Sequence, residues 1–123
     1  FSDSCSTDIF IHMDGQEVFK FAVKSVPTAI ETLLHNNNMD VNDVDKFILH
    51  QANVRIIESV AKRLKADKDK FPVNLNEYGN TSSASIPILL DELNRNGSLK
   101  QGEKLVLAGF GAGLSWGSIL LVW

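Results

Sequence analysis

Apolar residues recur along this chain with a helical period over 16–35. They return every three or four positions, which predicts a helix with one buried face. These positions are Val18, Phe19, Ala22, Val23, Val26, Ile30, Leu33 and Leu34. Pro27 falls inside the segment and should kink the helix, because proline removes a backbone donor and crowds the preceding turn. Three asparagines at 36–38 then predict a turn.

Two shorter helices are predicted further along the chain. The apolar run 47–49 predicts a short buried strand, and Asn53 after it can cap a helix. The inner face of that helix would be Ile56, Ile57, Val60, Ala61 and Leu64. The other helix has Pro87 in its opening turns and ends at Gly97, a residue suited to a left-handed cap. Its apolar positions are Ile88, Leu89, Leu90 and Leu93.

Three more segments have the character of strands. The segment 71–75 is a weak candidate. The segments 104–110 and 114–123 are strongly apolar and are joined at glycines, which predicts a hairpin-like pair of central strands. Strands that alternate with helices indicate a layered α/β domain.

The composition of the 123 residues is that of one globular domain, with 44% hydrophobic and 22% charged residues. Residues 1–8 are small and polar, so we expect a flexible lead-in before a domain at 9–123. The first residue is Phe1 and not methionine, which favours a piece of a longer protein. One cysteine cannot form an intrachain disulfide, and neither a signal peptide nor a bilayer-spanning stretch stands out. We therefore expect a cytoplasmic protein.

Two side chains are candidates for chemistry. His50 opens the sequence His-Gln-Ala-Asn directly after the strand 47–49, and Asn80 lies in the loop 79–85. Each is a hydrogen-bond donor beside a regular element, where scaffolds usually present reactive groups. If the fold brings them together, they can stabilise a developing oxyanion. The alternative from residue type alone is a satisfied, partly buried histidine and an asparagine that only forms a turn.

With the glycine-rich segment 109–117, these motifs resemble the C-terminal half of the beta-ketoacyl-acyl carrier protein synthase III family. These are condensing enzymes of the thiolase-like superfamily, and the resemblance spans 13–123. It implies a thiolase-like layered α/β/α half with a mixed sheet. It also implies decarboxylative Claisen condensation of an acyl thioester with malonyl-acyl carrier protein, in fatty acid biosynthesis, with no cofactor.

The resemblance assigns roles to residues around the two donors. His50 and Asn80 would hold the enolate oxygen that decarboxylation creates, with His50 neutral. The N–H of Ala112 would bind the second oxyanion, although many relatives carry glycine there. Phe110 would form an apolar wall near the malonyl carboxylate, the alternative being plain core packing. In the family, the nucleophilic cysteine belongs to the N-terminal half, which this chain is expected to lack. Cys5 is not expected to replace it, because Cys5 lies in the polar lead-in and is expected to be inert.

Partner binding is the second implication of the resemblance. Arg55, with Ala52 and Asn53 before it, would contact carrier protein or coenzyme A, and Gly15, Gln16 and Phe19 would line the pantetheine channel. Relatives often have asparagine in place of Gln16. An acidic acyl carrier protein would suit the local basic residues, for which the alternative is a solvated helix face. They are Arg55, Lys62, Arg63, Lys65, Lys68 and Lys70.

The expected partners are therefore acyl carrier protein, an acyl-CoA substrate, the N-terminal half and, at full length, a second copy in a homodimer. A pI near 5.5 argues against nucleic acid, and no membrane partner is expected.

Two rival functions stay open: a thiolase-like acyltransferase that moves the acyl group to oxygen or nitrogen, and a non-catalytic module that docks acyl carrier protein. No metal is expected, because His12, His35 and His50 sit singly. A serine hydrolase is disfavoured although 113–117 spells Gly-x-Ser-x-Gly, because no histidine follows Ser115.

Overall fold

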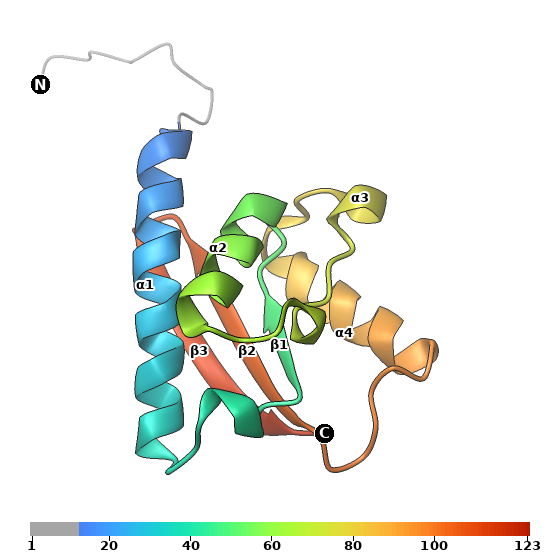
Figure 1. Ribbon diagram of the computed structural model, residues 1–123. Helices are drawn as coiled ribbons and strands as arrows, with labels where there is room; N and C mark the ends of the chain where they lie inside the picture. Colours follow the sequence, from blue (N-terminus) through green and yellow to red (C-terminus); the bar gives the residue numbers. More distant parts are fainter. Residues whose placement is uncertain (1–12) are drawn as a thin grey trace, which may run out of the picture.

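The computed structural model describes residues 13–123, and Figure 1 shows their course. The predictions for 1–8 and for Cys5 lie outside the described residues. Four α-helices and three strands follow one another in the described part. They are α1 (Gly15–Asn36), β1 (Lys46–Leu49), α2 (Val54–Leu64), α3 (Leu75–Tyr78), α4 (Ser85–Arg95), β2 (Lys104–Gly111) and β3 (Ser115–Val122). Short 3-10 turns occur at Val41–Asp43, Lys68–Lys70 and Ser82–Ala84.

The three strands form one mixed sheet in the order β1-β2-β3. β1 is parallel to β2, with Phe47 opposite Val106, and β2 is antiparallel to β3, with Gly109 opposite Gly117. The predicted hairpin is therefore confirmed. Its description as a central pair holds only for β2, because β3 is an edge of the described sheet.

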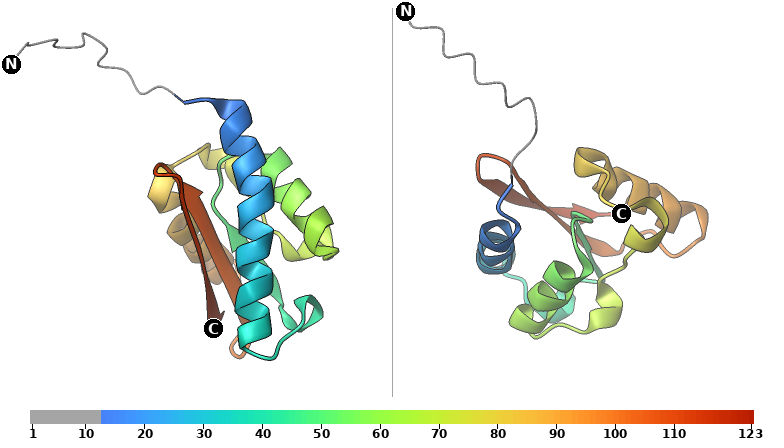
Figure 2. Two further views of the ribbon diagram at one scale, coloured as in Figure 1. Left: turned by 90° about the vertical axis from the view of Figure 1, so that its left-hand side faces the viewer. Right: turned by 90° about the horizontal axis from the view of Figure 1, so that it is seen from above.

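Helices cover both faces of this sheet (Figures 1 and 2). The alternating side chains of a strand point to opposite faces, so Phe47 and Leu49 join the core under α1 and α2. Ile48 points the other way and packs with Leu89 and Leu93 of α4. The expected α/β/α layering is confirmed, and it leaves the ends of the strands to carry polar groups.

The first helix runs through Pro27 without interruption. Asp14 begins it by accepting hydrogen bonds from the backbone N–H groups of Gln16 and Glu17. Pro27 has no N–H for the carbonyl of Val23, and Arg63 of α2 donates to that oxygen instead, at 3.4 Å. A partner from the neighbouring helix thus compensates for the proline.

The signals for the other two helices are also confirmed. Asn53 Oδ1 accepts a hydrogen bond of 2.9 Å from the N–H of Arg55, which caps α2. All five residues of the predicted inner face are buried. Gly97 follows α4 with a φ of +75°, the left-handed conformation that glycine adopts without strain.

The predicted strand at 71–75 is wrong. Pro72 has no N–H to give to a neighbouring strand, and Asn74 N–H is bonded to the side chain of Gln51 at 3.2 Å. Phe71 is buried by stacking on Phe47, with ring centroids 4.6 Å apart. The apolar character that suggested a strand therefore anchors an irregular segment, and α3 begins at Leu75.

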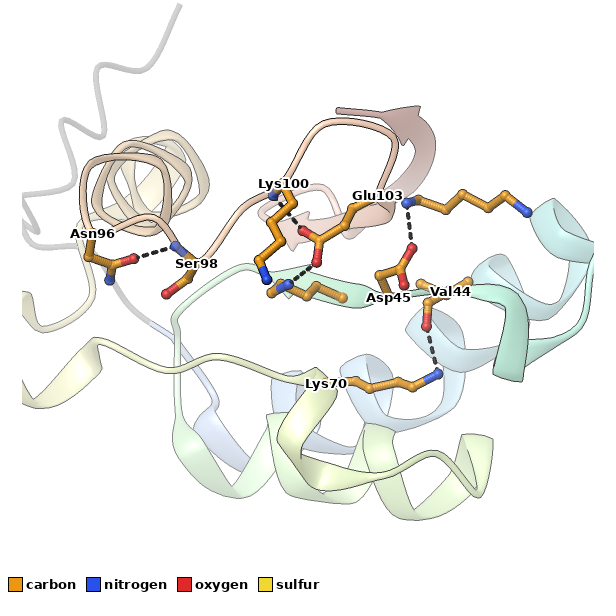
Figure 3. A network of polar contacts seen from close by, with 9 residues as sticks. Val44, Asp45, Lys70, Asn96, Ser98, Lys100 and Glu103 are labelled. Atoms are coloured by element: carbon orange, nitrogen blue, oxygen red, sulfur yellow. Dashed lines mark hydrogen bonds and ion pairs between the residues drawn. The ribbon is translucent and has the colours of Figure 1, made fainter.

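A network of polar contacts lies near the residues at which β1 and β2 begin (Figure 3). Glu103 accepts from Lys46 Nζ at 2.7 Å and from the N–H of Lys100 at 3.0 Å. Lys70 Nζ donates to the carbonyl of Val44 at 2.7 Å. These contacts tie the connections before β1 and β2 together.

Over residues 13–123, no helix has the length and apolar character needed to cross a membrane.

Candidate active site

An open cavity of about 930 Å³ lies where β1 and β2 end. Its lining includes His50, Asn80, Phe110 and Ala112, four of the residues that the sequence singled out. They come from the end of β1, the loop before α4, the end of β2 and the turn into β3. In Figure 1 these segments meet at the upper end of the sheet. The fold therefore gathers groups that are up to 62 positions apart in the chain, from 50 to 112.

His50 is held by its backbone and by one ring nitrogen. Its N–H continues the parallel ladder by donating to Ala108 O at 2.9 Å. Nδ1 lies 2.6 Å from Ser85 Oγ at the start of α4, and Phe110 presses on the ring edge-to-face at 5.2 Å between centroids. These contacts leave Nε2 as the ring atom available to a ligand.

Burial lowers the pKa of His50 below its ordinary value of 6.5. The cause is desolvation, which penalises the charged imidazolium more than the neutral ring. Among residues 13–123, no acidic side chain lines the cavity to offset that cost. Burial therefore favours the neutral form of His50, which can offer one N–H donor.

Asn80 has a defined orientation although it is exposed. Its Oδ1 accepts a hydrogen bond of 3.0 Å from the N–H of Ser82. A backbone N–H can only donate, so the bonded atom must be the amide oxygen, and the amide nitrogen points elsewhere. The preceding Gly79 has a φ of +66°, which allows the chain to turn sharply into this loop. Among the described residues the amide N–H₂ has no hydrogen-bond partner, and Asn80 lines the cavity.

Phe110 and Ala112 also line the cavity. Phe110 is half-buried and packs against the core under α1 and α2 as well as against His50. The contacts of Phe110 are those of core packing, and the residue also lines the cavity; its role as a wall near the malonyl carboxylate stays a prediction. Ala112 is exposed in the turn between β2 and β3.

The remaining predicted binding residues do not line this cavity. Phe19 and Ala52 are packed against the core, and the side chain of Asn53 is engaged in capping α2. Gly15 and Gln16 are exposed in the first turn of α1, and Arg55 is exposed in the first turn of α2. Both of these helix starts lie at the same end of the molecule as the cavity (Figure 1).

A buried polar chain behind His50 was missed by the sequence analysis. Ser85 Oγ also accepts from the N–H of Gln51 at 3.2 Å. The fully buried Gln51 donates to Leu49 O at 2.9 Å and accepts from the N–H of Asn74. Asn74 Nδ2 then donates to Glu92 Oε2 at 2.8 Å. Gln51 and Ser85 stood inside the recognised motifs, but no local pattern indicates which distant group a buried polar side chain meets.

Comparison with known proteins agrees with this arrangement. Residues 34–123 match the family described as 3-Oxoacyl-[acyl-carrier-protein (ACP)] synthase III C terminal. Beta-ketoacyl-[acyl-carrier-protein] synthase III of Clostridium tetani is 54% identical over 114 residues, which is 93% of this chain and 34% of that protein. The protein of the same name from Pyropia yezoensis is also 54% identical, over 92% of this chain and 35% of its own length.

Solved structures of such synthases share the fold. The crystal structure of 3-oxoacyl-[acyl-carrier-protein] synthase III from Aquifex aeolicus has a TM-score of 0.91 at 41% identity, covering 99% of this chain and 39% of that one. The Thermus thermophilus synthase III has a TM-score of 0.87 at 41% identity, over 91% and 35% of the two chains. The expected thiolase-like half is thereby confirmed.

The chain spans about a third of the length of the curated relatives it matches. The family match covers most of the chain, including the strands and loops that build the cavity. On these findings the chain belongs to the 3-oxoacyl-[acyl-carrier-protein] synthase III C-terminal family.

Proposed function

We propose that the protein containing this chain catalyses decarboxylative condensation of an acyl thioester with malonyl-acyl carrier protein, in fatty acid biosynthesis in the cytoplasm. The observation that carries the proposal is that His50 and Asn80 line the same cavity. In each side chain one polar atom is hydrogen-bonded within the protein, His50 Nδ1 to Ser85 and Asn80 Oδ1 to the N–H of Ser82, and the nitrogen that remains can donate to a ligand. Relatives named as synthase III support the substrate class.

The two donors suit the first chemical step. When malonyl thioester loses carbon dioxide, the electrons of the breaking carbon–carbon bond move onto the thioester as an enolate. The enolate oxygen carries charge that the ground-state carbonyl lacks, so fixed donors stabilise the transition state selectively. In this proposal His50 Nε2–H and the amide of Asn80 bind that oxygen.

Condensation follows when the enolate carbon attacks an acyl group held as a thioester on a cysteine. That attack creates a second oxyanion, which we assign to the backbone N–H of Ala112. The oxyanion then collapses and expels the cysteine thiolate, so a new carbon–carbon bond replaces the carbon–sulfur bond. The cysteine would come from the rest of the protein. Phe110 places an apolar ring beside His50, where it would favour departure of neutral carbon dioxide over a bound carboxylate.

Acyl carrier protein and acyl-CoA are the proposed partners, together with the N-terminal half and, in a homodimer, a second copy. Three of the six basic residues have contacts within the chain: Arg63 with Val23 O, Lys68 with Glu58 at 3.9 Å, and Lys70 with Val44 O. Arg55, Lys62 and Lys65 are exposed on α2 and just after it, and they are the better candidates for an acidic carrier protein. Gly15, Gln16 and Phe19 stay proposed channel residues.

The deciding experiment uses the full-length protein with malonyl-carrier protein and an acyl-CoA. Release of carbon dioxide coupled to chain extension supports the condensing enzyme. Acyl transfer without carbon dioxide release would indicate the acyltransferase, and carrier binding without either reaction would indicate a docking module.

Variants connect that activity to the cavity. Asn80→Ala should lower kcat about 100-fold to 1,000-fold, as expected for losing one oxyanion donor. Asn94→Ala is the matched control, because Asn94 is exposed on α4 away from the cavity. Unchanged turnover in Asn80→Ala would remove this residue from the mechanism.

A further inference from the structure

The hydroxyl of Ser85 has a position that its neighbours define closely. Ser85 is 2% exposed and opens α4. Among the described residues its Oγ has two polar contacts: the N–H of Gln51 at 3.2 Å and His50 Nδ1 at 2.6 Å. A serine hydroxyl has one proton to donate and two lone pairs that accept.

Counting the protons on Ser85 Oγ, the Gln51 N–H and His50 Nδ1 decides whether Nδ1 is protonated or not. The N–H of Gln51 can only donate, so it occupies one lone pair of Ser85 Oγ. If His50 Nδ1 also carried a proton, the hydroxyl would accept twice, and its own proton would have no acceptor in a buried place. If Nδ1 is bare, the hydroxyl donates to it and every proton has a partner. Buried polar groups are nearly always satisfied, which favours the second arrangement.

We propose that Ser85 is a positioning residue that donates its hydroxyl proton to His50 Nδ1 and so keeps the single ring proton of His50 on Nε2. Nε2 is the ring nitrogen left available to the cavity. Gln51 supports this role, because its buried side chain fixes the segment after β1 and its N–H already occupies one lone pair of the hydroxyl. The catalytic consequence of this inference rests on the proposed function, but the position of the proton does not.

The position of the proton can be measured without any activity assay. We would label the full-length protein with 15N-histidine, record the imidazole nitrogens at pH 7.5, and assign His50 by the loss of its signals in His50→Gln. The expected spectrum has a protonated Nε2 and a bare Nδ1. A protonated Nδ1 in the unmodified protein would overturn the proposal, even if no variant at Ser85 could be prepared.

Substitution then tests whether Ser85 is the cause. Ser85→Ala removes the donor, so His50 should become a mixture of both neutral forms, and kcat should fall about 10-fold to 100-fold with little change in KM, as for a misaligned catalytic group. Ser85→Thr keeps a hydroxyl and should restore both the Nε2 proton and the rate. Ser98→Ala is the control, because Ser98 is exposed beyond the end of α4. An unaltered proton distribution in Ser85→Ala would overturn the proposal.

The two measurements separate this inference from the proposed function. A protein that condenses substrates but carries the ring proton on Nδ1 contradicts only the role of Ser85. A protein with the proton on Nε2 that releases no carbon dioxide from malonyl-carrier protein contradicts the proposed function and leaves the assignment of the proton intact.

Discussion

His50 combines exposure to a cavity with a ring that water reaches only in part. Phe110 shields one side of the ring, and Ser85 occupies Nδ1. The same contacts that orient the ring also make the cation unfavourable, because a second ring proton would compete with the Ser85 hydroxyl for one hydrogen bond. Geometry and protonation state are therefore coupled at this residue.

The lowered pKa of His50 leads to a titration experiment. The ring should titrate below its ordinary value of 6.5 in the folded protein, and Phe110→Ala should move the midpoint back towards 6.5 by admitting water. Unfolding below pH 6.5 then takes up a proton, so stability should decrease as the pH falls through this range. NMR titration of His50 checks both midpoints, and a folded-state midpoint above 6.5 would contradict the burial argument.

Asn53, the residue that caps α2, has two suggested roles. Asn53 caps the helix through its side-chain oxygen, while the resemblance places it near coenzyme A or carrier protein. A side chain whose oxygen is already bonded to Arg55 N–H has only its amide nitrogen left for a ligand. The contacts show the capping role of Asn53.

Substitutions at Asn53 can separate the two duties. Asn53→Ala should lower the free energy of unfolding by about 1 kcal/mol, and Asn53→Ser should retain most of it because serine also caps. Thermal and urea unfolding of both variants give these values. If Asn53→Ser is fully stable but has a raised KM for acyl-CoA, then Asn53 binds substrate as well.

The connection between α4 and β2 depends on the ion pair of Glu103 with Lys46, whose side chains are each 19% exposed. The hydrogen bond from Lys46, then that from the Lys100 backbone, lower the pKa of Glu103 below its usual value of 4.5. A carboxyl group with a depressed folded-state pKa stabilises the protein above the unfolded pKa, and that stabilisation is lost as pH falls through the folded pKa.

Glu103→Gln should therefore cost roughly 1 kcal/mol at pH 7, because it keeps the shape but loses the charge-assisted bond. The difference from the unmodified protein should shrink as the pH falls below 4.5. Urea unfolding across this pH range measures it, and the exposed Glu31→Gln serves as control. A difference that stays constant with pH would show that the ion pair contributes nothing.

For the whole molecule, the dominant feature is an apolar surface along the second half of the hairpin. Trp116, Ile119 and Val122 of β3 are 53%, 62% and 63% exposed. Leu114 and Trp123 at its two ends are 47% and 36% exposed. Monomeric proteins rarely expose so many large apolar side chains on one edge strand.

The isolated chain should therefore self-associate. Light scattering as a function of concentration should show growing particles, and Ile119→Lys combined with Val122→Lys should reduce them by placing charge on the edge strand. The full-length protein is the comparison, because its other half would cover this surface. A clean monomer at high concentration would contradict the expectation that the chain is half of a larger fold.

Elements with local sequence signals could be predicted before the structure was known. Helical periodicity, the Asn53 cap, the Gly97 terminus and the glycine-joined hairpin depend on neighbours a few positions away, and each was correct because short-range geometry is enough to specify it. The motifs around His50 and Asn80 could also be recognised in the sequence, because the family resemblance covers the whole segments that contain them.

The conformation of 71–75 and the contacts of Ser85 depend on tertiary packing. A proline and a buried phenylalanine are compatible with a weak strand and with an anchored loop, so the sequence does not distinguish the two. The structure shows a loop, because the N–H of Asn74 donates to the side chain of Gln51 and not to a neighbouring strand. Ser85 meets His50 across 35 positions, and the Gln51 N–H arrives from the same distant segment. Hydrogen-bond partners of buried polar groups depend on how layers pack, so one-dimensional patterns leave them undetermined.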